Sequence, residues 1–525
     1  MTAIPQRLLG EALLISENKY ASKIVIITKS KKYSYSELKA GSIKIATQLC
    51  FSGIKKGDRI AVYMNNSWQS AVAIYGITLA GGVFIVINPQ TKADKLKFIL
   101  DDSGAKILIA ESGLSHEFVI ALKKTSQVLE VILAGFSEHK KFQFDFKVTL
   151  FEEILKADFQ ETTLPNIIPN DLAALIYTSG STGFPKGVMM THQSMVFTCW
   201  SLIQYLRINE NDRILLLSPL AFDYGLYQLL MAVTIGGSLL AEQSFVFQST
   251  IYKQIKKYKP TVFPGVPTIF AMMIAASKKS DLSFGCIKKI TNTAAALPAE
   301  FIPELKKIFP NALIFSMYGL TECKRVCYLE PELVDEKPGS VGKAIPGTEV
   351  FLLSPEGNPV PPNERGILHI RGPHVMLGYW HKEDLSKEML KQGELPFERV
   401  LCSNDWFKMD EEGFLYFMGR NDDIIKTRGE KVSPVEIENV IYKIDGVKEV
   451  AVIGIPDEIL GESIVAYVTN YNNIELNRKD IQKECVLKLE NFMVPQQVIF
   501  LDEMPKSTNG KIDKKSLKEL RLKNE

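Results

Sequence analysis

The chain is poor in the residues that build metal clusters and disulfide frameworks. It has 7 cysteines and 6 histidines among 525 residues, and the cysteines are scattered, with no C-x-x-C pair and no histidine cluster at zinc spacing. This pattern argues against a disulfide-stapled scaffold and a zinc-ribbon protein, and it predicts a reducing, cytoplasmic location. Cys323 and Cys327 could share a helix face, and we interpret them as small buried thiols.

The chain also lacks an excess of either charge. Its 62 basic and 60 acidic residues give a formal net charge of +2, so nothing in the composition predicts nucleic-acid binding. Met1 to Tyr20 has no basic start followed by an apolar core, and it reads as an amphipathic helix rather than a signal peptide. The uncharged stretch from Ala71 to Asn88 is split by Gly81-Gly82, so we expect no membrane span.

Two stretches of the chain look like copies of one unit. Asp58-Arg-Ile60 begins a strand that leads through a helix to Gly81-Gly82 and a second strand. Asp212-Arg-Ile214 begins a similar strand, and its helix ends at Gly236-Gly237 before another strand. The matched order of strand, helix, Gly-Gly and strand predicts two related α/β subdomains with parallel-rich sheets.

The composition changes near residue 420. A charge-dense stretch over 419–426 is followed by short strand signals at Val450–Ile455 and Ile464–Val468. This pattern is typical of a small α+β domain of roughly 100 residues joined by a polar hinge. We place the boundary at Asp422, with one domain over 1–421 and the other over 422–525.

The most informative motif is Thr178-Ser-Gly-Ser-Thr-Gly-Phe-Pro-Lys-Gly187, which follows the strand-like run Leu172–Tyr177. The strand places this loop at a sheet edge where α/β proteins bind ligands. Its glycines let backbone N–H groups turn toward one anion, and its hydroxyls and lysine add donors and charge. A flexible Ser/Gly surface turn is the alternative. The residues expected to contact phosphate are Thr178, Ser179, Gly180, Ser181, Thr182, Gly183 and Lys186.

The loop is not a Walker A motif, because that motif has Gly before its Lys and Ser or Thr after it, whereas Pro185 and Gly187 flank Lys186 here. It resembles instead the phosphate-binding signature of the AMP-forming adenylating superfamily, which includes acyl-CoA synthetases, adenylation domains of nonribosomal peptide synthesis and luciferases. The resemblance implies an α/β fold in which two related parallel-rich sheet subdomains and a small β subdomain form an adenylation domain over 1–421. A mobile α+β domain over 422–525 would be hinged to it.

Further segments match the family in order and imply a site for ATP and Mg²⁺. Tyr318-Gly-Leu-Thr-Glu322 matches Y-G-x-T-E, in which Tyr318 would stack on adenine, Thr321 would contact the α-phosphate and Glu322 would hold Mg²⁺. Asp405, which ends Cys402-Ser-Asn-Asp405, would accept from the ribose hydroxyls, although Asn404 replaces a glycine of many relatives. The other residues that the resemblance assigns here are Gly319, Arg420, the adenine-lining Ala294, Ala295 and Ala296, and Thr178 as a second metal ligand.

The carboxyl-terminal part of the chain implies two successive reactions in one site. Lys511, in the turn-rich tail Pro505–Lys514, matches the lysine that contacts the carboxylate and α-phosphate during adenylation. In relatives the small domain then rotates about a hinge, which falls on Asp422, and presents another face to a thiol. Lys426, Gly429 and Lys431 match that second face. A nucleotide-binding scaffold without turnover is disfavoured, because Lys511 and Glu322 are both present.

The sequence motifs specify the substrate acid and the acceptor thiol less directly than they specify the nucleotide. Phe222, Asp223, Tyr224 and Tyr227 lie in an apolar stretch and are expected to bind the acid. The Phe-Asp pair resembles amino-acid-activating members, where the Asp binds an α-ammonium; a helix-capping Asp before Tyr224–Met231 is the alternative. We therefore expect an amino acid, such as proline, loaded on the phosphopantetheine thiol of a separate carrier protein. The alternative is an acyl-CoA synthetase that joins a fatty or aromatic acid to coenzyme A.

Overall fold

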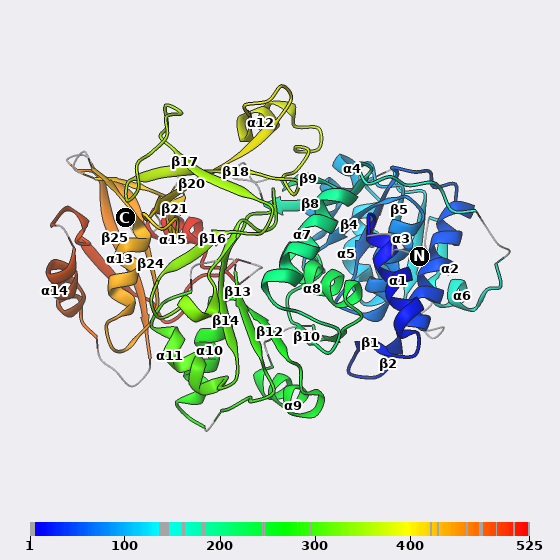
Figure 1. The fold of residues 1–525 in the computed structure, drawn as a ribbon, viewed down its shortest axis with the longest axis horizontal. Helices are drawn as coiled ribbons and strands as arrows, with labels where there is room; N and C mark the ends of the chain where they lie inside the picture. The colour runs from blue at the N-terminus through cyan, green and yellow to red at the C-terminus, as the bar shows by residue number, and fades with distance from the viewer. Residues whose placement is uncertain are drawn as a thin grey trace.

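The computed structural model describes most of the chain. The described residues are 6–125, 127–135, 146–159, 163–179, 185–243, 245, 247–280, 282–293, 297–420, 423–427, 430–457, 460–471, 476–489, 491–507 and 510–522; the side chains of Ser179, Lys426, Glu430, Lys431 and 521–522 lie outside this description. Figure 1 shows the first subdomain in blue and cyan on the right, the green second sheet in the centre, and the small domain in orange and red on the left.

The first subdomain is built on a sheet of seven described strands in the order β7-β6-β5-β3-β4-β8-β9, parallel except for β9. All five residues of β4 are buried, as expected for a parallel strand covered on both faces. The strands are β3 (Arg59–Tyr63), β4 (Val83–Ile87), β5 (Ile107–Glu111), β6 (Glu130–Ala134), β7 (Val148–Leu150), β8 (Leu172–Ser179) and β9 (Pro185–Thr191). The helices nearby are α1 (Leu9–Tyr20), α2 (Tyr35–Phe51), α3 (Trp68–Leu79), α4 (Ala93–Ser103), α5 (Ser115–Leu122), α6 (Phe151–Lys156), α7 (His192–Tyr205) and α8 (Asp223–Thr234).

The second subdomain has a parallel core, β14-β13-β12-β10-β11-β1, which the antiparallel β2 extends at one edge. Its strands are β1 (Ile24–Ile27), β2 (Lys32–Ser34), β10 (Arg213–Leu216), β11 (Ser238–Ala241), β12 (Val262–Gly265), β13 (Lys289–Asn292) and β14 (Leu313–Tyr318). Its helices include α9 (Gln248–Tyr258), α10 (Pro267–Ser277) and α11 (Phe301–Ile308). The amino-terminal strands β1 and β2 thus complete a sheet whose other strands follow residue 212.

The predicted repeat is confirmed by the backbone. Arg59 pairs with Val83 in the first sheet, and Arg213 pairs with Ser238 in the second. The carbonyl of the preceding aspartate, Asp58 or Asp212, accepts the N–H of the paired residue at 2.8 or 3.0 Å. In each copy the first glycine has a left-handed φ, of +72° and +71°, which explains why the two turns use the same residue.

A third group of strands forms the small β subdomain, which is continuous with the second sheet rather than separate from it. Strands β15 and β16 join the antiparallel strands to β14. The elements are β15 (Cys327–Tyr328), β16 (Ser340–Ala344), β17 (Glu349–Leu353), β18 (Arg365–Arg371), β19 (Leu390–Gln392), β20 (Arg399–Met409), β21 (Leu415–Arg420) and α12 (Glu383–Met389). This subdomain brings β20 and β21 to the carboxyl end of β14.

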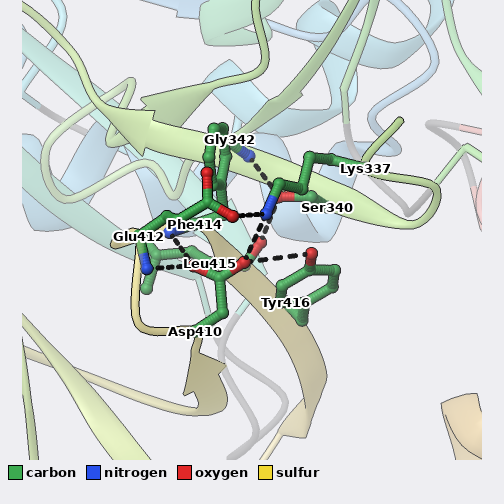
Figure 2. A network of polar contacts seen from close by, with 8 residues as sticks. All are labelled: Lys337, Ser340, Gly342, Asp410, Glu412, Phe414, Leu415 and Tyr416. Carbon is green, nitrogen blue, oxygen red and sulfur yellow. Dashed lines mark hydrogen bonds and ion pairs between the residues drawn. The ribbon is translucent and has the colours of Figure 1, made fainter. Parts of the chain in front are cut away.

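A polar network braces the end of β20. Figure 2 shows Lys337, which precedes β16, reaching Asp410 and Glu412 in the turn that follows β20. The distance from the Lys337 ammonium to the Asp410 carboxylate is 3.1 Å. On the same side, the Ser340 hydroxyl donates to the Leu415 carbonyl at 2.9 Å. The two strands that carry Asp405 and Arg420 are therefore fixed to β16 at their joining turn.

The small carboxyl-terminal domain has its own sheet and core. Strands β24 and β25 form a long antiparallel pair, and β26 pairs with β25 in parallel. The elements are β22 (Ile425–Thr427), β23 (Glu430–Val432), β24 (Val447–Asp457), β25 (Gly461–Asn470), β26 (Gln497–Phe500), α13 (Pro434–Tyr442), α14 (Arg478–Lys488) and α15 (Lys514–Leu522). The large domain's last strand ends at Arg420, and the proposed boundary residue, Asp422, lies outside the described residues. In the described part of the chain, no helix combines the length and apolarity that crossing a bilayer requires.

Substitution of the matching lysine in each copy of the repeat should lower the free energy of unfolding by different amounts. Lys289 and Asp212 form a buried ion pair at 2.6 Å, with 9% and 6% of their side chains exposed, whereas the matching Lys106–Asp58 pair leaves 38% of Lys106 exposed. Lys289→Met should cost about 3–5 kcal/mol of unfolding free energy because it strands a buried carboxylate. Lys106→Met should cost about 1 kcal/mol or less. Urea titrations of both variants check this, and equal losses would contradict it.

Candidate active site

The predicted phosphate loop joins two described strands. Strand β8 ends at Ser179 and β9 begins at Pro185, and Thr178 pairs directly with Lys186. The strand before the motif is therefore confirmed, and the chain returns antiparallel after the loop. The loop residues Gly180, Ser181, Thr182 and Gly183 lie outside the described residues, so their predicted contacts stay predictions.

Lys186 meets Glu322 and Tyr379 at the site's centre. Its ammonium lies 3.5 Å from Glu322 Oε1 and donates to the Tyr379 hydroxyl at 2.7 Å. That hydroxyl donates in turn to Glu322 Oε1 at 2.6 Å. Burial, followed by the neighbouring Glu322 charge, raises the pKa of Tyr379, which keeps the phenol protonated as a donor. Three segments of the chain thus converge on one carboxylate oxygen.

Gly319 lets the chain turn tightly between Tyr318 and Glu322. A Cβ at this position would lie 2.2 Å from the carbonyl oxygen of Lys324, which is far inside contact distance. No other residue therefore fits this turn without displacing the backbone. The close approach of the Lys324 carbonyl to Gly319 is enough to explain the glycine of the Y-G-x-T-E motif. Thr321 lies half-buried in the same turn.

Tyr318, Asp405 and Arg420 form a second polar cluster. The Tyr318 hydroxyl donates to the Asp405 carboxylate, and Arg420 Nε lies 3.7 Å from the same carboxylate on the paired strand β21. The Tyr318 ring packs against Phe417, with centroids 5.9 Å apart and planes 27° from parallel. Burial raises the pKa of Asp405 to about 6, although Arg420 opposes the shift. Asn404 adopts a left-handed φ of +56°, which asparagine tolerates, so the replaced glycine does not disrupt the strand.

Lys511 reaches this site from the small domain. Its charge interacts with Asp223 and Asp405, which raise its pKa, but burial and the like charge of Arg420 prevail and lower it. The Thr268 hydroxyl of α10 donates to the neighbouring Gly510 carbonyl at 2.7 Å, which fixes the tail against the large domain. The structure therefore brings together the predicted residues Lys511, Asp405, Arg420 and Asp223, from both domains.

Asp223 is the first residue of α8. Its Oδ1 accepts the Tyr224 N–H at 2.9 Å, but the N-cap residue is Phe222 and no side-chain cap bond forms there, so the capping alternative is not confirmed. The same side chain interacts electrostatically with Lys511 and with Lys324. Tyr224 is buried and donates to the Thr291 carbonyl at 2.8 Å. Tyr227 is buried on the next turn of the helix, while Phe222 precedes it and is half-buried.

Several predicted residues lie outside what the structure describes. They are Ala294, Ala295, Ala296, Asp422 and Gly429, together with the side chains of Ser179, Lys426 and Lys431. The backbone places Lys426 opposite Lys431 in the β22–β23 pair, so both predicted thiol-side lysines share one hairpin.

The sequence motifs missed Tyr379, Lys324 and Arg325. Tyr379 follows β18 by several residues and stands in no recognisable pattern, although its contact with Lys186 joins positions 193 residues apart. Lys324 and Arg325 follow the Y-G-x-T-E motif after Cys323, and both are buried, at 1% and 5% exposure. The sequence signal that could have identified Lys324 and Arg325 is the presence of two consecutive basic residues close to the Y-G-x-T-E motif.

The residues present fit a Mg²⁺ ion held together with nucleotide phosphates. Mg²⁺ in such sites takes one or two carboxylates and fills its remaining positions with phosphate and water oxygens. The contacts of the Glu322 carboxylate with Tyr379 and Lys186 are made through Oε1, so its second oxygen would serve a cation. Among the described residues, no group of three His, Cys, Asp or Glu side chains forms a metal cage.

A large α/β body whose site receives a lysine from a small carboxyl-terminal domain is the arrangement expected of an AMP-forming enzyme. The model of the AMP-binding enzyme family matches residues 15–380, and that of the AMP-binding enzyme C-terminal domain matches residues 436–511. The chain therefore belongs to the AMP-binding enzymes, the AMP-forming adenylating superfamily of acid–thiol ligases. The predicted family and fold class are confirmed.

Similar proteins extend over the whole chain. The long-chain-fatty-acid–CoA ligase of Bacillus subtilis (strain 168) is 30% identical over 545 aligned positions, covering 99% of this chain and 96% of that protein. The 2-succinylbenzoate–CoA ligase of Bacillus velezensis is 29% identical, with 99% of each chain covered. Among solved structures, ATP-bound MatB from Rhodopseudomonas palustris is 26% identical, with a TM-score of 0.86 over 98% of this chain and 99% of that chain.

The raised pKa of Asp405 predicts a pH-dependent stability difference. Because folding favours the protonated carboxyl, its contribution is complete below about pH 4 and is lost as pH rises through about 6. Asp405→Asn stays neutral, so its unfolding free energy relative to wild type should increase between pH 4 and 7, by at most about 3 kcal/mol. Urea titrations across this range measure the difference. A difference that does not change with pH would contradict the assignment.

Proposed function

We propose that the protein is an ATP-dependent acid–CoA ligase. It joins a carboxylic acid to AMP, releases pyrophosphate, and then transfers the acyl group to the thiol of coenzyme A. The observation that carries this proposal is the position of Lys511, a half-buried small-domain lysine whose neighbour Gly510 is hydrogen-bonded to the large domain and whose charge interacts with Asp223 and Asp405. A lysine at that point is where the adenylation reaction needs a cation.

The first half-reaction brings two anions together. A carboxylate oxygen forms a bond to the α-phosphorus while the bond from that phosphorus to pyrophosphate breaks, and the electron pair leaves on pyrophosphate. Positive charge fixed on both sides of phosphorus lowers this barrier. Lys511 would neutralise the attacking carboxylate and the α-phosphate, with Thr321 donating to that phosphate. Lys186, already oriented by Tyr379, would follow the phosphates that leave.

The nucleotide would lie between the two polar clusters. Tyr318 would stack on adenine beside Ala294, Ala295 and Ala296, and Asp405 with Arg420 would fix the ribose. Glu322 and Thr178 would hold Mg²⁺, which neutralises phosphate charge when bound. The pKa of about 6 for Asp405 supports this role, because the side chain is an ionised acceptor at neutral pH.

The second half-reaction needs Lys511 to leave so that a thiol can enter. Rotation about Asp422 would withdraw the tail and present Lys426, Gly429 and Lys431. Among the described residues, the contacts between the two domains include the Phe301–Tyr442 ring contact and an ion pair, Arg365–Glu436 at 2.9 Å, which is partly exposed on both sides. A cavity of about 350 Å³ lies beside it between β21 and α13. A loosely packed interface favours relative motion of domains.

Coenzyme A is the acceptor that the similar proteins support. The relatives compared above are named as CoA ligases, and none supports an amino acid carried on a separate protein. The charges in the site also argue against an amino-acid substrate. Asp223 already faces the cations Lys324 and Lys511, so its charge is compensated before any substrate ammonium arrives.

The acceptor prediction can be tested by measuring AMP release. Purified protein is incubated with ATP, Mg²⁺ and a panel of fatty, aromatic, short dicarboxylic and amino acids, with coenzyme A or with phosphopantetheinylated carrier protein. We expect AMP formation with coenzyme A and a carboxylic acid, and none that depends on the carrier. AMP release that requires the carrier and an amino acid would restore the alternative. No release with any acid would refute the ligase proposal.

Lysine substitutions should separate the two half-reactions. Lys511→Met is expected to slow pyrophosphate exchange by about 10²–10³-fold, because it removes charge stabilisation in the transition state. Transfer from a supplied acyl-adenylate to coenzyme A should remain. Lys426→Met should show the reverse pattern. Lys514→Met is the matched control, since Lys514 pairs with Glu438 within the small domain at 2.8 Å. Equal losses in both half-reactions would contradict the rotating-domain account.

A further inference from the structure

Lys324 is a basic side chain that is buried without a hydrogen-bond partner among the described residues. Only 1% of the residue is exposed, and among the described residues its Nζ has no hydrogen-bond partner. Burial without hydrogen bonds is costly for an ammonium group, and native proteins retain such a group chiefly where it has a task. The nucleotide half of the site does not account for it, since Glu322 is already occupied by Lys186 and Tyr379.

The turn that carries Glu322 also fixes Lys324. Lys324 has a left-handed φ of +70°, which side chains other than those of Gly, Asn and Asp seldom adopt. Its N–H donates to the Leu320 carbonyl at 2.7 Å, and the next N–H, of Arg325, donates to the Cys323 carbonyl at 2.9 Å. The strained backbone therefore holds the lysine inward, within electrostatic range of Asp223 at the start of α8.

Arg325 adds a second buried cation on the acid side of the site. Its guanidinium carbon lies 5.3 Å from the ring centroid of Tyr224, a residue predicted to contact the acid. Nη1 donates to the Lys324 carbonyl at 2.9 Å, while Nε has no partner among the described residues. One face of the guanidinium is thus used by the protein, and one of its donors remains unsatisfied.

The charges around Asp223 do not balance. Lys324 and Arg325 carry two positive charges, while the negative charges that act on Lys324 are those of Asp223 and of Glu322, and Glu322 already faces Lys186 at 3.5 Å. Within the part of the chain that the structure describes, neither cation forms an ion pair of 4.0 Å or less. The acid side therefore has unsatisfied donors and an excess of positive charge, the complement of an anion.

We propose that Lys324 and Arg325 form a subsite for a second carboxylate of the substrate, so that the preferred acid is a short dicarboxylic acid. This inference rests on the proposed ligase function. An alkyl chain at this point would leave both cations desolvated and unpaired, which disfavours a fatty acid. An α-ammonium would meet two like charges for one carboxylate, which disfavours an amino acid.

The test compares each dicarboxylic acid with its monomethyl ester in pyrophosphate exchange, over a series of chain lengths and beside a fatty acid. Wild-type protein should prefer one diacid over its ester by about 10- to 100-fold in kcat/KM, the effect of one hydrogen-bonded charge pair. Lys324→Met should lose most of that preference, and Lys324→Arg should keep it. Lys256→Met, at an exposed lysine of α9, should match wild type.

Folding is checked by thermal unfolding without substrate. Lys324→Met should unfold at the same or a higher temperature than wild type, because it removes an unpaired buried charge. The inference is overturned if wild type prefers the ester, the fatty acid or an amino acid. It is also overturned if Lys324→Met lowers exchange with diacid and ester equally, since Lys324 would then serve the reacting carboxylate or α-phosphate. Absence of exchange with every acid in wild-type protein would instead refute the ligase function itself.

Discussion

Side chains from the two sheet subdomains and the small β subdomain meet at one carboxylate oxygen of the large domain. Glu322 Oε1 faces Lys186 from the first subdomain and accepts from Tyr379 of the small β subdomain, while Glu322 itself follows β14 of the second. A buried carboxylate needs such partners, since leaving it alone would be severely unfavourable. The requirement to pair this charge therefore fixes how the two sheets and the antiparallel strands approach one another, and the site lies where they meet.

The small domain adds charges that the large domain does not need for folding. Lys511 is half-buried within electrostatic range of Asp223, Asp405 and Arg420, and its pKa is lowered by desolvation and by Arg420. A cation held at such a cost is readily released when the nucleotide charge disappears, because little else retains it. The contacts that accompany it include the Thr268–Gly510 hydrogen bond, the Arg365–Glu436 ion pair and the Phe301–Tyr442 ring contact. The same electrostatics that place Lys511 for adenylation thus favour its withdrawal afterwards.

Local sequence patterns predicted much of the fold and the nucleotide side of the site. The strand before Thr178 and the Asp-Arg-Ile and Gly-Gly repeat depend on neighbouring residues, so they were readable from the sequence. Tyr379 was not, because its role depends on a contact across 193 residues. The expected small β subdomain is present, and β15 and β16 make it continuous with the second sheet.

The acid side of the site was the least predictable part, and physical reasons explain why. Asp223 was interpreted by itself as an ammonium receptor, but the meaning of a buried charge depends on which charges face it after folding. The chain places Lys324 and Arg325 there through a strained turn that no periodicity reveals. A relative with 30% identity aligns along 99% of this chain, whereas only a few side chains would contact the acid. Two cations on the acid side of the site therefore carry more information about the substrate than the names of similar enzymes do.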